Sequence, residues 1–441
     1  MKSLEQLRVG KLTGSRRLNL SCHLKEFPRE IFELADTLEI LDLSGNKLSE
    51  LPEDLSRLHQ LKILFCSNNL FTTLPAVLGQ CPNLSMIGFR ANQIASIPAA
   101  ALPPDLRWLV LTDNQISELP STLGNCTSLQ KLMLAGNQLR ALPPSIENCT
   151  KLELLRISAN QFSVLPDVLF DLPNLSWLAF AGNPLSNLAD SASSIREINW
   201  HDLALKQMLG EGASGVIHQA EWLGNGSSMP VAVKIFKGQL TSDGLPQHEM
   251  AACLRAGVSP NLISVFGKIV NHPNHAQGLV MSLIDPDFSN LAGPPSLDSC
   301  TRDCYSPDDT FTPSKLLQIA LSIAAAAKHL HAKGIMHGDL YAHNIMVRHD
   351  GFSLLGDFGA ATLYTPTADK FSHGLQRIEV LAFGRLLAEL LTRCEPLPQA
   401  VAMLQSLQQL QLQCADPCLA NRPLFDEIET ILKQLSIDIQ T

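Results

Sequence analysis

Two short stretches in the second half of the chain carry the side chains best suited to chemistry. The stretch "MHGDLYAHN" holds Asp339 and, five positions later, Asn344, and the stretch "LLGDFGAA" holds Asp357. A carboxylate can accept a proton from a hydroxyl group, and carboxylate and amide oxygens are the ligands that Mg²⁺ prefers. We therefore expect Asp339 to act as a base, and Asn344 and Asp357 to bind magnesium ions.

A second pair of candidate residues lies earlier in the chain. Lys234 ends the apolar segment "VAVK", and Glu249 lies in "PQHEMAACLRA", a stretch expected to be a helix. A lysine can neutralise the α- and β-phosphate oxygens of a nucleotide, and a carboxylate paired with that lysine would hold it in place. We expect Lys234 and Glu249 to form this pair and to be catalytic together with Asp339.

A glycine-rich turn precedes the lysine. Gly210, Gly212 and Gly215 lie between two alternating apolar stretches, a pattern that predicts a hairpin of strands whose backbone can close over phosphate groups. Such a glycine pattern is weak evidence by itself. The position of the glycines argues against a dinucleotide site, because a hairpin followed by a lysine-bearing strand differs from the strand-to-helix turn of such a site.

In this order along the chain, the motifs resemble those of eukaryotic-like protein kinases, over roughly residues 203 to 436. The resemblance is nearest to the tyrosine-kinase-like group of serine/threonine kinases. It implies a bilobal α+β domain that uses ATP and Mg²⁺. It also implies a gatekeeper at Met281, an adenine-binding hinge from Ser282 to Ile284, and structural roles for Glu379 in "IEVLAFG" and Arg422 in "NRP".

The resemblance extends the set of expected ATP-binding residues beyond the glycines and the lysine. That set is Gly210, Glu211, Gly212, Ala213, Ser214, Gly215, Val216, Ile217, Ala232, Lys234, Met281 and Ile284.

Three departures from the kinase pattern surround Asp339. Gly338 stands where an arginine usually precedes the base, and Tyr341 stands where serine/threonine kinases place a lysine that touches the γ-phosphate. His343 occupies the position where tyrosine kinases place an arginine. Gly338 has no side chain that could pair with a phosphorylated segment. We therefore expect slow turnover and a site that is not switched by phosphorylation.

The segment after Asp357 also departs from the family. It reaches Glu379 in only 22 positions and contains no APE motif, so it departs from the usual platform for a peptide substrate. Its hydroxyl groups would be the candidates for a phosphate switch: Thr362, Tyr364, Thr365, Thr367 and Ser372.

The first half of the chain contains an internal repeat. Segments such as "LEILDLSGNKL" and "LQKLMLAGNQL" end in asparagines at 46, 69, 92, 114, 137, 160 and 183, spaced 23, 23, 22, 23, 23 and 23 apart. This is the leucine-rich repeat pattern, in which stacked repeats close a shared core and each asparagine bonds backbone groups where the chain leaves the strand. "RRLNLSCHLKEFP" is interpreted as a shortened first repeat. Cys81, Cys126 and Cys149 occupy one equivalent slot and are expected to be packed.

Two columns of strand residues in the repeats are expected to be exposed on the concave side. They contain apolar side chains, including Phe65, Trp108, Met133 and Trp177. Adjacent strand residues could simply cover one another, but aromatic and methionine side chains also favour a protein-binding surface. We interpret this face as the site for a protein substrate or partner.

Composition narrows the possible compartments and partners. A net charge of -9 argues against nucleic-acid binding, because phosphate recognition depends on a basic field. The 11 cysteines are odd in number and scattered, which is typical of a reduced cytoplasmic protein. The sequence shows neither the apolar core of a secretion signal nor a membrane span, so we expect a soluble protein.

These observations predict an α/β leucine-rich-repeat solenoid over residues 1–188, a linker over 189–202 and a bilobal α+β protein-kinase-like domain over 203–441. The combination resembles the soluble leucine-rich-repeat kinases of bacteria. The expected function is that of an ATP-dependent protein kinase of the non-specific serine/threonine class, whose repeats recruit proteins. Two alternatives stay open: an ATP-binding pseudokinase scaffold whose repeats carry the biological role, and a small-molecule kinase of the same fold.

Overall fold

The computed structural model describes residues 4–186, 196–212, 214–223, 228–237, 240–241 and 243–438. Ala213, one of the expected ATP-binding residues, lies outside this set. The chain forms two compact units. The first comprises Met1–Leu175 with Asn183–Leu185, and the second comprises Ser176–Gly182 with Ser186–Thr441.

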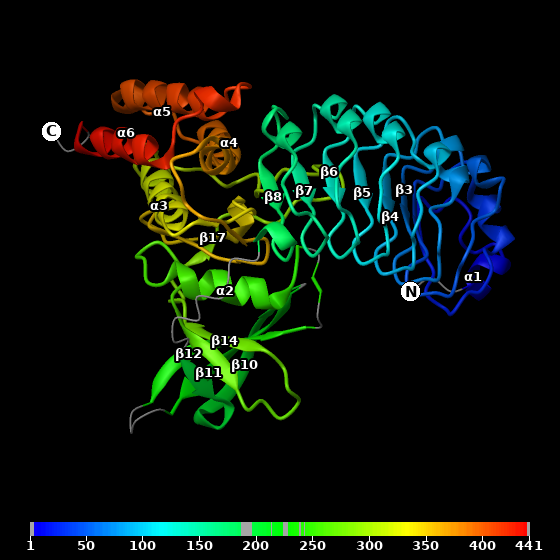
Figure 1. Ribbon diagram of the computed structural model, residues 1–441, viewed down its shortest axis with the longest axis horizontal. Helices are drawn as coiled ribbons and strands as arrows, with labels where there is room; N and C mark the ends of the chain where they lie inside the picture. Colours follow the sequence, from blue (N-terminus) through cyan, green and yellow to red (C-terminus); the bar gives the residue numbers. More distant parts are fainter. Residues whose placement is uncertain are drawn as a thin grey trace. The chain divides into compact units, whose positions relative to one another are not determined.

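Parallel strands of three residues each form the sheet of the first unit (Figure 1). They pair in sequence order, each in register with the next. Helix α1 (Leu4–Arg8) precedes them, and the strands are β1 (Arg17–Asn19), β2 (Ile40–Asp42), β3 (Ile63–Phe65), β4 (Met86–Gly88), β5 (Trp108–Val110), β6 (Lys131–Met133) and β7 (Leu154–Arg156). Strand β1 lies in the stretch that the sequence predicts to be a shortened first repeat, and its parallel pairing with β2 confirms this prediction.

The return segments of the repeats form short 3₁₀ helices, most of which begin directly after a proline. They are η1 (Arg29–Leu34), η2 (Leu55–Arg57), η3 (Ala76–Gln80), η4 (Ala99–Ala101), η5 (Ser121–Asn125), η6 (Pro144–Asn148) and η7 (Asp167–Phe170).

The repeat asparagines bond the backbone as the sequence predicts. The Nδ2 atom of Asn69 donates to the carbonyl oxygens of Leu43 at 2.9 Å and Cys66 at 3.1 Å, while its Oδ1 atom accepts from the Leu48 amide at 2.9 Å. One side chain therefore links two successive repeats. The thiols of Cys81, Cys126 and Cys149 are buried, which confirms packing as their role and raises their pKa values to about 11, 11 and 12.

The expectation of two exposed strand columns is wrong in part. Trp177 is only 2% exposed, and Ile63, Met86, Gly88, Leu154, Arg156 and Ala179 are also buried. In contrast, Phe65, Trp108, Val110 and Met133 are partly exposed. The repeat spacing places these positions on one face, but neighbouring chain decides which of them water reaches.

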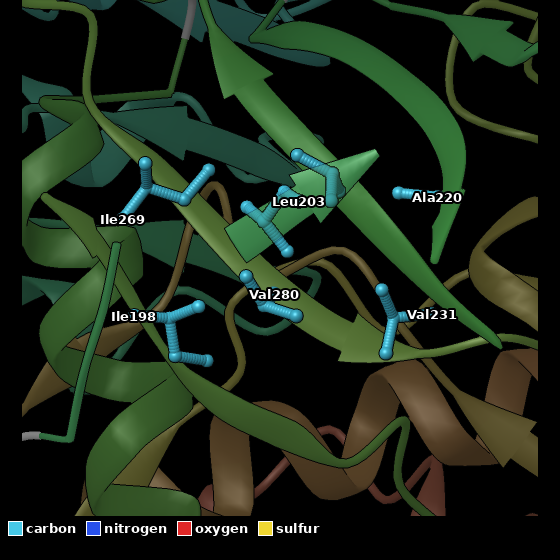
Figure 2. Close-up of a cluster of buried hydrophobic side chains, with 7 residues drawn as sticks. Ile198, Leu203, Ala220, Val231, Ile269 and Val280 are labelled. Carbon is cyan, nitrogen blue, oxygen red and sulfur yellow. The ribbon is translucent and has the colours of Figure 1, made fainter. Parts of the chain in front are cut away.

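The second unit contains a six-stranded sheet with the order β10-β11-β12-β14-β13-β9. Its strands are β9 (Glu197–Asn199), β10 (Leu203–Glu211), β11 (Gly215–Trp222), β12 (Met229–Phe236), β13 (Val265–Val270) and β14 (Gly278–Ser282). Strand β9 and the following η9 (Trp200–Asp202) fall in the stretch that the sequence assigns to a linker. Aliphatic side chains from the strands of this sheet form one core, in which Ile198 comes from β9 and Leu203 from β10 (Figure 2).

Helices make up most of the rest of this unit. They are α2 (Pro246–Ala256), α3 (Pro313–Ala332), α4 (Lys370–Thr392), α5 (Val401–Cys414) and α6 (Phe425–Asp438), joined by η10 (Ala342–Asn344), η11 (Pro398–Ala400) and η12 (Leu419–Asn421). Thr312 caps α3 and Asp369 caps α4, each through a side-chain oxygen that accepts from a backbone amide of the first turn. Among the described residues, none of the helices combines the length and apolar character needed to cross a membrane.

The remaining short strands frame the loops that carry the candidate catalytic residues. Strands β15 (Ser289–Asn290), β17 (Ile345–Val347) and β18 (Ser353–Leu355) form one antiparallel sheet, and β16 (Ile335–Met336) pairs with β19 (Thr362–Leu363). Strand β8 (Trp177–Ala179) and η8 (Pro184–Ser186) lie in the last repeat of the sequence, and the segment Ser176–Gly182 that contains β8 belongs to the second unit.

Candidate active site

Lys234 and Glu249 meet in the structure as the sequence predicts. Lys234 lies on β12 and Glu249 on α2, and the ammonium group donates a short hydrogen bond to the carboxylate. Burial lowers the pKa of Lys234, but the charges of Asp357 and Glu249 outweigh burial and raise it overall. Burial raises the pKa of the Glu249 carboxyl to about 7. Both residues are buried, so their charges interact more strongly than they would in water.

A cavity opens beside this pair. Of the expected ATP-binding residues, six line it: Gly212, Ser214, Gly215, Ile217, Lys234 and Met281. Gly210 and Glu211 are in register with Ile217 and Val216 across the hairpin, Ala232 is in register with Met281, and Ile284 follows the end of β14 by two residues. The cavity walls combine glycine backbone and a lysine with apolar side chains, as a nucleotide requires.

Several residues that line the cavity were not predicted. These are Cys253, Ile263, Val265, Gly356 and Phe358. Cys253 could have been found, because it follows Glu249 by one helical turn and so shares its face of the helix. Ile263 lies just before β13, and Val265 is its first residue. The position of this strand in the sheet depends on tertiary structure.

Asp339 and Asn344 form a hydrogen-bonded pair on the loop between β16 and β17. The Nδ2 atom of Asn344 donates to the Asp339 carboxylate at 2.8 Å and to the Asp339 carbonyl oxygen at 2.9 Å. This orients the Asp339 side chain and turns the amide oxygen of Asn344 away from it. The Asn344 carbonyl oxygen accepts from the Gly356 amide at 3.0 Å, which ties the loop to the residue before Asp357.

Asp357 completes the group. Its side chain is 52% exposed, lines the cavity and lies 3.9 Å from the Lys234 ammonium. The backbone has a φ of 51°, an uncommon left-handed conformation for a residue with a side chain, and the carboxylate accepts from the Gly359 amide at 3.1 Å. The local backbone therefore aims this carboxylate into the cavity.

The backbone before Asp339 is anchored by Glu379 on α4. Its carboxylate accepts from the Gly338 amide at 2.7 Å and the His337 amide at 3.3 Å, and it pairs with His331 at 2.7 Å. Burial acts to raise the pKa of Glu379, but the hydrogen bond and charge of His331 lower it overall. The structural role that the resemblance implies for Glu379 is thus to hold the backbone of the catalytic loop.

His343 has a partner that sequence reasoning missed. Its Nδ1 atom lies 2.7 Å from the Asp303 carboxylate, and its amide donates to the other carboxylate oxygen at 3.2 Å. Burial lowers the pKa of His343, but the hydrogen bond to Asp303 and the nearby carboxylates raise it overall. Asp303 lies 40 residues away in a loop, so sequence spacing carried no signal for this contact.

The donor set fits Mg²⁺. The Asn344 amide oxygen and the Asp357 carboxylate are hard oxygen ligands, and the amide nitrogen of Asn344 is already engaged by Asp339. The half-exposed Asp357 carboxylate is open to a cation on the cavity side.

Comparison with known proteins agrees with this geometry. Residues 203–380 match the family described as protein tyrosine and serine/threonine kinase. Residues 127–185 match one leucine-rich-repeat family, and residues 37–58 and 105–126 match a second. The chain combines leucine-rich repeats with a protein kinase domain. This confirms the predicted fold class, a repeat solenoid followed by a bilobal kinase fold.

Curated relatives resemble a limited part of the chain. It is similar to leucine-rich repeat and calponin homology domain-containing protein 1 of Mus musculus, with 34% identity over 123 residues, and to the Homo sapiens protein of the same name, with 33% identity. These matches cover 27% of this chain and 17% of each relative.

The structure also gives the contacts of Arg422, for which the resemblance implies a structural role. Arg422 is 1% exposed, and its guanidinium donates to the backbone carbonyl oxygens of Asp416 at 2.8 Å and Arg377 at 3.2 Å. Burial lowers the pKa of Arg422 to about 10. In the absence of an APE motif, this arginine joins α4 to the segment before α6 through main-chain acceptors.

Proposed function

We propose that this chain is an active, ATP- and Mg²⁺-dependent protein kinase directed at serine and threonine, and that its repeats recruit a protein. One observation carries the proposal: the Lys234–Glu249 pair and Asp357 line a single cavity, and the loop that carries the Asp339–Asn344 pair is hydrogen-bonded to Gly356 in the wall of that cavity. Phosphoryl transfer depends mainly on positioning and charge neutralisation, and these residues supply both.

Each residue has a defined role in this proposal. Lys234 binds α- and β-phosphate oxygens, and Glu249 fixes the position of its ammonium group. Asn344 and Asp357 hold magnesium, which when bound neutralises charge on the phosphates. Asp339 accepts the proton of the acceptor hydroxyl, oriented by the Asn344 amide at 2.8 Å. The glycine-rich hairpin covers the phosphates with its backbone.

Serine/threonine specificity rests on the likeness to the tyrosine-kinase-like group. The family matched by residues 203–380 includes kinases of both specificities. Recruitment rests on the partly exposed strand residues of the first unit, Phe65, Trp108, Val110 and Met133. We place a protein partner on this concave face, because repeats of this kind present their strands to partners.

A pseudokinase scaffold is the second candidate, and Tyr341 is the observation that favours it. A tyrosine stands where serine/threonine kinases place the lysine for the γ-phosphate, and it is only 4% exposed. A buried phenol cannot replace the charge of that lysine. A small-molecule kinase is the third candidate, favoured by the short segment after Asp357.

The deciding experiment measures transfer of labelled γ-phosphate from MgATP by the purified full chain, beside Asp339→Asn and Lys234→Met. The proposal expects transfer by the wild type only, with ATP binding retained in Asp339→Asn and lost in Lys234→Met. Phosphoamino acid analysis of the product should show phosphoserine or phosphothreonine. ATP binding without transfer in every sample would establish the scaffold. Equal transfer by wild type and Asp339→Asn would remove Asp339 from the mechanism.

A further inference from the structure

The residues that follow Asp339 are covered by Trp177, which comes from the last repeat of the sequence. The indole Nε1–H donates to the carbonyl oxygen of Leu340 at 3.0 Å. The indole ring stacks on the Tyr341 ring, with centroids 4.0 Å apart and planes inclined by 10°. Trp177 is 2% exposed and Tyr341 is 4% exposed. All three residues belong to the second compact unit, so these contacts lie within one body.

The same short segment, Ser176–Gly182, also contacts the chain on either side of the catalytic loop. The Phe180 amide donates to the Thr362 hydroxyl at 3.2 Å, in β19 just beyond Asp357. Arg385 of α4 donates to the Ser176 hydroxyl at 2.8 Å and lies 5.4 Å from the Trp177 ring centroid. The segment therefore bridges the catalytic loop, the segment after Asp357 and α4.

Gly338 is shaped to the same segment. Its φ is 74°, and a Cβ atom there would lie 2.7 Å from the carbonyl oxygens of both Leu178 and Ala360. A separation below about 3.0 Å forces one of the atoms to move. A side chain at this position, such as the arginine that the kinase pattern expects, would therefore require the Leu178 and Ala360 carbonyls to move.

We propose that Trp177 is a positioning residue for the base Asp339. It acts through Leu340 and Tyr341, which follow the base on the catalytic loop. Glu379 holds the Gly338 amide on one side of Asp339, and Trp177 holds the Leu340 carbonyl on the other. A loop fixed on both sides of the base keeps its carboxylate in one geometry, which is what proton transfer requires.

The inference rests on the proposed kinase activity, so its test has one readout that needs the activity and one that does not. The variants are Trp177→Ala, which removes the stack and the N–H donor, and Trp177→Phe, which keeps an aromatic ring but loses the donor. Trp200→Phe is the matched control, because it removes an indole from the same unit in contact with the β-sheet core and His272.

Turnover of MgATP should separate from ATP binding. Trp177 does not line the nucleotide cavity in the described residues, so the Kd and KM for ATP should stay at wild-type values. We expect kcat to fall at least about tenfold in Trp177→Ala, because misplacing a catalytic group by about 1 Å has large effects on rate. Trp177→Phe should recover most of this loss, leaving a deficit on the order of threefold for the missing hydrogen bond. Trp200→Phe should match the wild type.

Amide hydrogen exchange provides the second readout. Trp177→Ala should increase exchange in peptides that cover residues 338–344 and 360–364, while Trp200→Phe should leave them unchanged. Wild-type kcat and wild-type exchange in a folded Trp177→Ala would overturn the inference, as would a global rise in exchange with unchanged kcat. If the wild type binds ATP but transfers no phosphate, the proposed function fails, and exchange alone decides whether Trp177 positions the loop.

Discussion

The carbonyl oxygen of Leu178 lies 2.7 Å from the point that a Cβ atom would occupy on Gly338. This relationship explains the most conspicuous departure from the kinase pattern. A side chain on the glycine before the catalytic aspartate would collide with this carbonyl, 160 residues earlier in the chain, and equally with the carbonyl of Ala360.

Restoring a side chain at this position should therefore destabilise the protein. We expect Gly338→Ala to lower the free energy of unfolding by roughly 1–3 kcal/mol, and Gly338→Arg by more, measured by urea denaturation. Gly257→Ala is the control, since Gly257 has a φ of 66° but nothing within 4 Å of its Cβ position. A Gly338→Ala loss no larger than that control would show that the segment moves aside easily.

Removing the charge of Glu249 should change how ATP binding depends on pH. Its pKa is raised to about 7 by burial, so the carboxylate that fixes Lys234 is fully formed only above that pH. We expect the affinity of the wild type for MgATP to rise between about pH 6 and 8, and that of Glu249→Gln to be weaker and flat over this range. Isothermal titration at several pH values measures this. A wild-type affinity that is flat over the same range would contradict the role of Glu249.

The His343–Asp303 pair predicts a pH-dependent contribution to stability. The folded-state pKa of His343 lies above the unfolded value of 6.5. The stabilisation is therefore complete below about pH 6.5 and is lost as the pH rises through the higher folded-state pKa. We expect His343→Asn to lower the melting temperature more at about pH 5.5 than at about pH 9. Asp303→Asn should show the same dependence, and equal losses at both pH values would rule out a charged pair.

Phosphorylation after Asp357 should have little effect on turnover. Three of the five candidate hydroxyl groups, those of Thr362, Tyr364 and Ser372, are buried and out of reach of a modifying enzyme. Thr365 and Thr367 are exposed. We expect the double variant Thr365→Ala with Thr367→Ala to keep its rate within about twofold of wild type, since Gly338 offers no cation for a phosphate. Strong activation of wild type by prior phosphorylation at either site would show that another cation serves this purpose.

Recruitment by the repeats should depend on the strand residues that remain partly exposed. Trp108 is half-buried, with the Lys131 ammonium 4.3 Å from its ring centroid. For a protein captured by the wild type, Trp108→Ala should weaken binding by about 2 kcal/mol or more, as expected for an aromatic anchor. Val164→Ala, at a position 73% exposed and outside the strands, should have no effect. If both variants lose the same binding affinity, or if neither loses any, the recognition surface lies elsewhere.

Local pattern was sufficient for much of this protein. The 22- or 23-residue period predicted the stacked strands, because each repeat can bury its leucines only against its neighbours. The spacing of Asp339, Asn344 and Asp357 indicated two neighbouring loops, which the pairing of β17 with β18 and the hydrogen bond from the Gly356 amide to Asn344 hold together.

Tertiary structure alone decided how that group is supported. The sequence placed Trp177 on an exposed column, whereas the structure buries it against Tyr341, and no spacing indicated that Asp303 would meet His343. Such contacts join segments from 40 to more than 160 residues apart, and they form only where several elements pack around the same loop. Residue types can indicate which groups perform the chemistry, but the contacts that hold those groups in place depend on the packing of the whole unit.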